Sequence, residues 1–303
     1  MKRAPEKVYV KLKINMIRLL FQILSTLIIF GGIFGLAATI IVIPVLVPIG
    51  NPYTIVAGAW EILEALLTMG VIPFIAIVSI ALFALLAGRV GCAWWCPFGL
   101  IQDIISYVGK KKRISYVTNR KLTNIALFFL IIFLLIDLSI FYGKLSDINM
   151  KTYFGAFVRR PSSILDPSST LFSMLFFYFY WELYPKRLSD LSKLVNYPPA
   201  FYFRIILLII ILIVTYYYPR AYCRWLCPMG YLMGFLGKYA ILRVYRDPFR
   251  CTRCGECNKV CPMGINLLEY NGPIESELCI MCLACMEACS VPGALRVKLN
   301  IKG

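Results

Sequence analysis

Residues 251–289 read CTRCGECNKVCPMGINLLEYNGPIESELCIMCLACMEAC and hold eight of the twelve cysteines in a chain of 303 residues. Two runs share one spacing, Cys251-x2-Cys254-x2-Cys257-x3-Cys261 and Cys279-x2-Cys282-x2-Cys285-x3-Cys289. Three closely spaced thiolates can hold one four-iron cluster while the displaced fourth cysteine of the run reaches the other cluster. The spacing therefore predicts two [4Fe-4S] clusters in a C-terminal α+β domain of the bacterial ferredoxin type, over residues 244–303.

The crossed pattern assigns four thiolates to each cluster. Cluster 1 takes Cys251, Cys254, Cys257 and Cys289, and cluster 2 takes Cys279, Cys282, Cys285 and Cys261. Structural zinc is disfavoured because zinc ribbons do not use three successive short intervals. Disulfides are disfavoured because the cysteines lie on the predicted reducing side of a membrane. The second run is followed by Ser290 where the first has Pro262, from which we expect only a small local change.

A second cysteine pattern occurs twice upstream. Residues 91–99, GCAWWCPFG, match residues 222–230, YCRWLCPMG, and Arg89 aligns with Arg220. Both copies follow an apolar segment. This internal repeat predicts two parallel two-helix units, which would bring both cysteine pairs to one membrane face about a pseudo-two-fold axis.

The chemistry of these paired Cys-x-x-x-Cys-Pro motifs stays open. The interval predicts both thiols on one face of a helical turn, and the proline either ends that turn or opens a new helix at its first position. The four residues Cys92, Cys96, Cys223 and Cys227 could form an additional metal or redox site. They could equally serve thiol chemistry in assembly, or only pack, because free cysteine behaves as a small hydrophobe. The adjacent Trp94, Trp95 and Trp225 are interpreted as interfacial anchors.

The composition is that of a membrane protein, with 60% hydrophobic and 16% charged residues. Apolar runs predict four membrane spans, near residues 19–43, 65–87, 122–142 and 200–218, because about 20 apolar residues cross the hydrocarbon layer. A kink is expected at Pro73. Residues 55–68 and 170–181 are interpreted as interfacial or re-entrant. The predicted fold is thus mainly α, a four-helix transmembrane bundle over residues 1–243 followed by the cluster domain.

The net charge of +17 is clustered next to the spans. Basic residues precede the first span, and a second group, which includes Lys110, Lys111 and Lys112, follows the second span. By the positive-inside rule both segments are cytoplasmic, so the N- and C-termini are expected there too. The excess charge therefore indicates topology and membrane lipid, and no nucleic-acid partner is expected.

The chain contains no histidine, so bis-histidine or Cys-x-x-Cys-His haem is not expected. For quinone chemistry, the acids in or beside the spans are candidate proton acceptors. These are Glu61, Glu64, Asp103 and Asp137. Asp103 is preferred because it follows a cysteine-proline motif on the cluster side, whereas a site at the outer face would lie about 30 Å of bilayer away from the clusters.

Together, the two motifs at Cys92–Pro97 and Cys223–Pro228, the four spans and the double cluster module resemble the NapH/MauN-type ferredoxin-like membrane proteins of bacteria and archaea. The resemblance implies a multi-pass protein of the prokaryotic inner membrane. It also implies a quinol dehydrogenase subunit that passes electrons from quinol to a soluble or periplasmic iron–sulfur partner and onward to a terminal reductase. Other members are similar but serve in maturation of periplasmic metalloenzymes, and that alternative function stays open.

Overall fold

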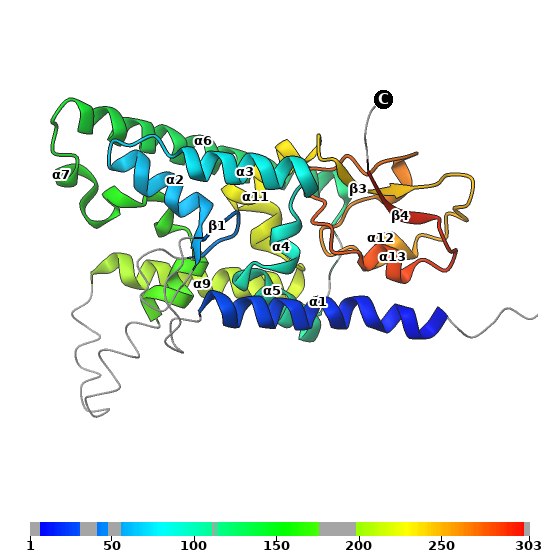
Figure 1. The fold of residues 1–303 in the computed structure, drawn as a ribbon. Coiled ribbons are helices and arrows are strands. Elements are labelled where there is room, and N and C mark those ends of the chain that lie inside the picture. The colour runs from blue at the N-terminus through cyan, green and yellow to red at the C-terminus, as the bar shows by residue number, and fades with distance from the viewer. Residues whose placement is uncertain are drawn as a thin grey trace, which may run out of the picture.

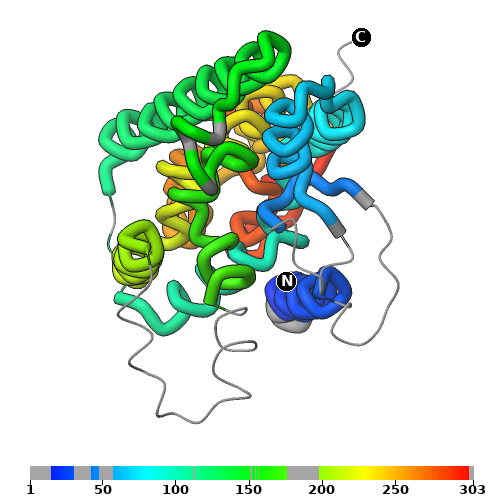
Figure 2. The backbone as a smooth tube through the Cα atoms, turned by 90° about the vertical axis from the view of Figure 1, so that its left-hand side faces the viewer, coloured from blue at the N-terminus to red at the C-terminus, as the bar shows by residue number. Residues whose placement is uncertain are grey.

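The protein is described here by a computed structural model covering residues 7–30, 41–47, 56–110, 112, 114–175 and 198–299. Most of these residues are helical, and the cysteine-rich C-terminal part lies at one end of the helical body (Figure 1). The longer helices are α1 (Lys7–Ile29), α2 (Ala59–Thr68), α3 (Phe74–Ala87), α5 (Pro97–Val108), α6 (Tyr116–Leu145), α9 (Pro199–Tyr217) and α11 (Pro228–Gly237). Viewed along the body, α1, α6 and α9 lie at its periphery (Figure 2).

Short elements connect these helices. Helix α4 (Val90–Trp94) precedes α5, and α10 (Ala221–Trp225) precedes α11. Between α6 and α9 lie α7 (Lys151–Phe154), α8 (Pro167–Ser169) and turns of 3-10 and π-helix within residues 155–175. The C-terminal part holds an antiparallel pair, β3 (Leu242–Arg246) and β4 (Leu295–Leu299), with α12 (Glu256–Val260) and α13 (Ala284–Ala288).

Two described helices are long and apolar enough to cross a membrane, Tyr116–Leu145 and Pro199–Tyr217. They correspond to the third and fourth predicted spans. The stretches Asn15–Ile29 and Phe74–Ala87 are apolar but shorter. The mainly helical fold is thus confirmed, while a four-span bundle stays a prediction.

The first two predicted spans are wrong in their extent. The segment 19–43 does not end as a helix, because Ile41–Ile43 forms β1, which pairs in parallel with β2 (Val56–Gly58). Three consecutive β-branched residues before Pro44 favour a strand there. Residues 65–87 form two helices where one kinked helix was predicted. Helix α2 ends at Thr68, Gly70 adopts a positive φ of 81°, and α3 starts directly after Pro73.

The buried side chains form two hydrophobic cores. The first lies among the helices and includes Trp60, Phe98 and Met229. The second lies in the cysteine-rich part and includes Met263 and Ile280. Both cores include a cysteine of the first motif, because Cys96 belongs to the helical core and Cys92 to the C-terminal core. The motif therefore sits where the two parts of the protein meet.

The two sequence repeats are joined by a reciprocal exchange of arginines. Arg89, from the first repeat, donates a hydrogen bond from Nη2 to the carbonyl of Cys223 in the second. Arg220, from the second repeat, donates from Nη1 to the carbonyl of Cys92 in the first, at 2.6 Å. Both guanidinium groups are buried, with residue exposures of 1% and 0%. The alignment of these arginines in the sequence thus corresponds to equivalent contacts between the two repeats.

Each arginine passes over a glycine of the other repeat. A Cβ atom at Gly99 would lie 2.7 Å from the carbonyl oxygen of Cys92 and 3.6 Å from Nη2 of Arg220. A Cβ atom at the matching Gly230 would collide with the guanidinium of Arg89. A side chain is therefore excluded at Gly99 by the Cys92 carbonyl that Arg220 binds, and at Gly230 by the Arg89 guanidinium itself.

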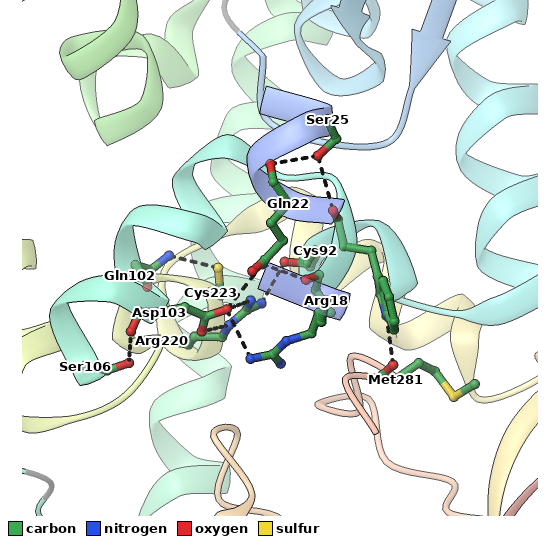
Figure 3. Close-up of polar contacts among 12 residues, drawn as sticks. Arg18, Gln22, Ser25, Cys92, Gln102, Asp103, Ser106, Arg220, Cys223 and Met281 are labelled. Carbon is green, nitrogen blue, oxygen red and sulfur yellow. Dashed lines mark hydrogen bonds and ion pairs between the residues drawn. The ribbon is translucent and has the colours of Figure 1, made fainter. Parts of the chain in front are cut away.

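Asp103 belongs to the same junction (Figure 3). Its carboxylate accepts two hydrogen bonds from Arg220, one of them at 2.8 Å from Nε. Arg18 lies 3.6 Å away, and Gln22 donates to the same carboxylate at 3.2 Å and to the carbonyl of Ala93 at 2.6 Å. Burial alone would raise the pKa of Asp103, but Arg220 and Arg18 outweigh burial and lower it below its ordinary value. Asp103 is thus an ionised partner that holds α1, α5 and the second repeat together.

We predict that Gly99→Ala destabilises the protein. In an unconstrained helix this change would add stability, because alanine favours the helix by about 1 kcal/mol. Here the added methyl crowds the Cys92 carbonyl, and overpacking of this kind costs about 1–3 kcal/mol. Thermal unfolding in detergent shows whether the substitution raises or lowers the stability of the protein. Ile104→Ala, at a half-exposed position of the same helix, is the control, and a Gly99→Ala protein as stable as the wild type would contradict the crowding.

Asp103→Asn is predicted to cost about 3 kcal/mol or more, because it leaves the Arg220 guanidinium buried without a counter-charge. The lowered pKa of Asp103 determines the pH range over which this residue stabilises the folded protein. An acid whose pKa is depressed on folding contributes its full stability above its unfolded pKa of about 3.9, and loses it as the pH falls below that value.

The stability difference between the wild type and Asp103→Asn should therefore persist down to about pH 4 and shrink below it. Denaturant titrations at several pH values measure it. Asp147→Asn, at an exposed position, is the matched control. A difference that is already lost at pH 6 would contradict the ion pair.

Candidate functional site

The first cysteine group of the C-terminal part surrounds a pocket. All four cysteines that the crossed pattern assigns to cluster 1 line this pocket: Cys251, Cys254, Cys257 and Cys289. Leu268, Val291 and Leu295 supply apolar walls. Two loops that are more than 30 residues apart in the chain thus bring four thiols to one small space, which is the arrangement that a cube-shaped cluster needs.

Hydrogen-bond donors face the thiols of this pocket. The buried Arg246 donates from Nε to the Sγ of Cys251 at 3.3 Å and is held in turn by the carbonyl of Tyr270 at 2.7 Å. Burial opposes ionisation of Cys251, but the backbone N–H of Arg253 and the charge of Arg246 outweigh it and lower its pKa. Donors to sulfur favour the thiolate and tune the potential of a bound cluster. Sequence reasoning missed Arg246, whose only signal was its place at the end of a strand.

The thiols of the second group also lie close together. This group consists of Cys261, Cys279, Cys282 and Cys285. Cys282 interacts electrostatically with each of the other three thiols. Burial raises the pKa of Cys261 to about 11 and that of Cys279 to about 12, and the neighbouring Cys282 adds to both shifts. These thiols therefore stay protonated at neutral pH unless a bound cation displaces the protons.

The two cysteine runs share one backbone conformation. In the first run Arg253 and Gly255 have positive φ, and in the second the matching Met281 and Leu283 do too, at 53° and 62°. Glycine adopts this conformation freely, whereas leucine does so at a cost. The second run thus keeps the geometry of the first without its glycine. After the second run, Cys289 donates to the carbonyl of Val291 at 3.3 Å.

The thiol arrangement fits iron–sulfur clusters better than isolated ions. Among the described residues, no three Cys, Asp or Glu side chains are grouped so as to hold a single metal ion. The cysteines nevertheless gather in fours, and each of the twelve is free. A cluster of several irons spaces its four ligands more widely than one ion does. The residues present therefore fit iron–sulfur clusters, while two clusters with crossed ligation stay a prediction.

Polar side chains of the helical part fasten the cysteine-rich part. Asn119, fully buried on α6, donates to the carbonyl of Met263 at 3.0 Å and accepts from Arg224 and Trp225. Trp94 donates to the carbonyl of Met281 at 3.1 Å. The interpretation of Trp94 and Trp225 as interfacial anchors is therefore wrong, because their indole N–H groups bond inside the protein. Asn119 was missed because it lies in what the sequence presents as a basic cytoplasmic loop.

The motif cysteines are all buried beside this junction. Cys92 lies in α4, Cys96 has an extended backbone at the N-terminus of α5, and Pro97 is the first residue of that helix. Cys223, Cys227 and Pro228 repeat the arrangement in α10 and α11. The proline thus opens a new helix, as one of the two readings predicted. The two thiols of a motif do not share one continuous helical turn.

The acids proposed for quinone chemistry fall into two places. Asp103 is bound by Arg220, so its contacts favour a structural role over proton uptake. Glu61, Glu64 and Asp137 are buried, at 4%, 0% and 0% exposure. Glu64 accepts hydrogen bonds from the hydroxyl and N–H of Ser162, at 2.7 and 3.2 Å. The carboxyl oxygens of Glu61 and Asp137 have no hydrogen-bond partner among the described residues.

A mainly apolar pocket of about 80 Å³ has the buried Asp166 in its lining and lies beside Ser162, which donates to Glu64. Its walls include Trp60, Phe129 and Tyr222, and its polar lining includes Ser162. Tyr222 and Pro228, which also line it, flank the cysteines of the second motif. The pocket therefore connects a buried carboxyl group with the motif thiols. Nothing in the sequence indicated it, because its lining comes from six separate stretches of the chain.

Two family descriptions match parts of the chain. Residues 243–290 match the family described as "4Fe-4S dicluster domain". Residues 66–115 and 200–246, which contain one cysteine-proline motif each, match the family described as "4Fe-4S binding domain". These matches agree with the two cysteine patterns read from the sequence. No solved structure matches the chain.

Three curated proteins are similar to parts of this chain. The putative electron transport protein YccM of Escherichia coli is 24% identical over 82% of this chain and 60% of its own length. Protein NirI of Paracoccus denitrificans is 24% identical over 72% of this chain, which spans only 28% of NirI. The ferredoxin-type protein NapH of E. coli is 33% identical over 23% of this chain and 26% of its own length. The chain is thus an iron–sulfur electron transport protein related to NapH, NirI and YccM.

Proposed function

We propose that this chain is a membrane-embedded subunit of a quinol dehydrogenase. In this proposal four spans anchor it, and the eight C-terminal cysteines hold two [4Fe-4S] clusters on the cytoplasmic side. Electrons pass from quinol to these clusters, then to a partner iron–sulfur protein and an extracytoplasmic reductase. When bound, the clusters supply one-electron transfer. The names of YccM and NapH, an electron transport protein and a ferredoxin-type protein, support this reading.

The observation that carries the proposal is the continuity between the buried pocket and the cysteine-rich part. Tyr222 lines the pocket and precedes Cys223. Across the repeat junction, Cys92 packs in the same core as Cys257 and Cys282, one from each cluster group. A redox reaction in the pocket would therefore be linked to the clusters through closely packed protein.

The pocket is suited to the ring of a quinol. Oxidation of a quinol to a quinone releases two electrons and two protons, so an adjacent group must accept protons. Glu64 is fully buried and is already hydrogen-bonded to Ser162, which lines the pocket. Asp103 was the preferred acceptor on sequence grounds, but its bond to Arg220 leaves Glu64 as the better candidate.

Entry of the ring requires some movement of the pocket lining. A cavity of about 150 Å³ binds benzene in another protein, and this pocket offers about 80 Å³. Phe129 and Leu207 are only partly buried at the edge of the helical core, so their rotation would open the pocket toward α6 and α9. Both helices are apolar enough to face lipid, from which a quinol would enter.

We predict that Cys254→Ser and Cys282→Ser each remove one cluster. Because the crossed assignment places these residues in different groups, electron paramagnetic resonance of the reduced, anaerobically purified variants should show one cubane signal lost and the other retained. Thr252→Ser, an exposed change within the same loop, should leave both signals. Survival of both signals in either cysteine variant would refute the ligand assignment.

We further predict that a quinol analogue reduces the clusters in lipid nanodiscs within a turnover time, and that Glu64→Gln slows this reaction roughly a hundredfold, as expected for loss of a proton acceptor. Absorbance bleaching after rapid mixing measures the rate. Glu256→Gln, an exposed acid in the cluster domain, is the matched control. An unchanged rate in Glu64→Gln would reject Glu64, and no bleaching in the wild type would favour the alternative function of a maturation factor.

A further inference from the structure

The four motif cysteines form one buried group at the repeat junction. Their residue exposures are 7% for Cys92, 3% for Cys96, 4% for Cys223 and 4% for Cys227. Cys92 and Cys223 interact electrostatically with each other, and each also interacts with Cys96 and with Cys227. The exchange of Arg89 and Arg220 brings the two pairs together. Neither motif alone offers more than two thiols.

Hydrogen-bond donors converge on these thiols. Gln102, fully buried on α5, donates from Nε2 to the Sγ of Cys223 at 3.0 Å. The backbone N–H of Gly230 donates to the Sγ of Cys227 at 3.2 Å. Cys96 and Cys227 also cap the N-termini of α5 and α11, where helix dipoles favour negative charge. Cys223 and Cys227 thus already accept hydrogen bonds of the kind that a metal-bound thiolate accepts.

Positive charge at this junction is incompletely balanced. Arg220 is neutralised by Asp103. Arg89, in contrast, forms no ion pair with any described residue, and its Nε has no hydrogen-bond partner among them. The position that matches Asp103 in the second repeat is Gly234, which packs against the Arg89 side chain. A buried guanidinium without a counter-charge is costly, and it indicates that an anionic group belongs beside Arg89.

The chemical class of that group follows from the ligands. A single zinc ion is disfavoured, since the described residues contain no grouping that would hold one metal ion. Each repeat matches a 4Fe-4S binding family but supplies only two cysteines, whereas a four-iron cluster takes four thiolates. A cluster with four cysteine thiolates carries a net negative charge, which Arg89 would offset.

We propose that Cys92, Cys96, Cys223 and Cys227 together hold a third iron–sulfur cluster, shared between the two repeats. Its place follows from the packing, because Cys96 and Cys227 belong to the helical core and Cys92 to the core of the cluster domain. The binding site stands on these contacts alone. Its use as a relay between the pocket and the C-terminal clusters rests on the proposed function.

The test is the content of iron and acid-labile sulfide in anaerobically purified, full-length protein. Three clusters of four irons each give about 12 iron atoms and about 12 sulfides per chain. Cys96→Ser/Cys227→Ser should lower both values to about eight while the two ferredoxin-type resonances persist, which shows that the variant is folded. Ser106→Ala, on the same helix as Cys96, should keep about 12 of each.

The wild-type count decides the question even if the double variant fails to fold. A wild-type content of about eight irons, with the four motif thiols open to alkylation after unfolding, would overturn the third cluster and leave the two C-terminal clusters intact. One zinc per chain lost on the double substitution would also overturn it. A content near zero would overturn both the third cluster and the proposed function.

Discussion

The arrangement of this protein depends on two buried arginines that each bind the opposite repeat. Arg89 and Arg220 donate to the carbonyls of Cys223 and Cys92, and these bonds lie where solvent is excluded. A hydrogen bond from a charged donor is worth more than a neutral one, and leaving such a donor unpaired in the interior is expensive. The exchange therefore sets the distance between the repeats, leaves no room for a side chain at Gly230, and brings four cysteines together.

From this junction the rest of the structure can be followed in both directions. Toward the helices, Tyr222 and Pro228 line the pocket beside Glu64 and Ser162. Toward the C-terminus, Trp94 and Asn119 bind the carbonyls of Met281 and Met263. The pocket, the motif thiols and the cluster groups thus lie in sequence along one packed interior. Such continuity is what stepwise electron transfer through a membrane protein requires.

Much of this could be predicted from the sequence, because short-range patterns determined it. The spacing of Cys251 to Cys289 predicted that these thiols gather, and four of them line one pocket, while the crossed ligation stays a prediction. The apolar runs predicted α6 and α9. What escaped prediction depends on tertiary contact. Gln22 lies in an apolar run yet donates a hydrogen bond to Asp103. Arg246 donates to the thiol of Cys251, a contact that the position of Arg246 in the sequence did not indicate. The segment 41–43 is a strand only because Val56–Gly58 lies beside it.

The most direct measurement is anomalous X-ray scattering at the iron edge from crystals of protein purified without oxygen. The account predicts an iron peak within each C-terminal group, bounded by Cys251 and Cys289 and by Cys261 and Cys279, and another between Cys92 and Cys223. An iron-free C-terminal part, or peaks that appear only at the zinc edge, would contradict the central claim that this chain conducts electrons through clusters held by its cysteines.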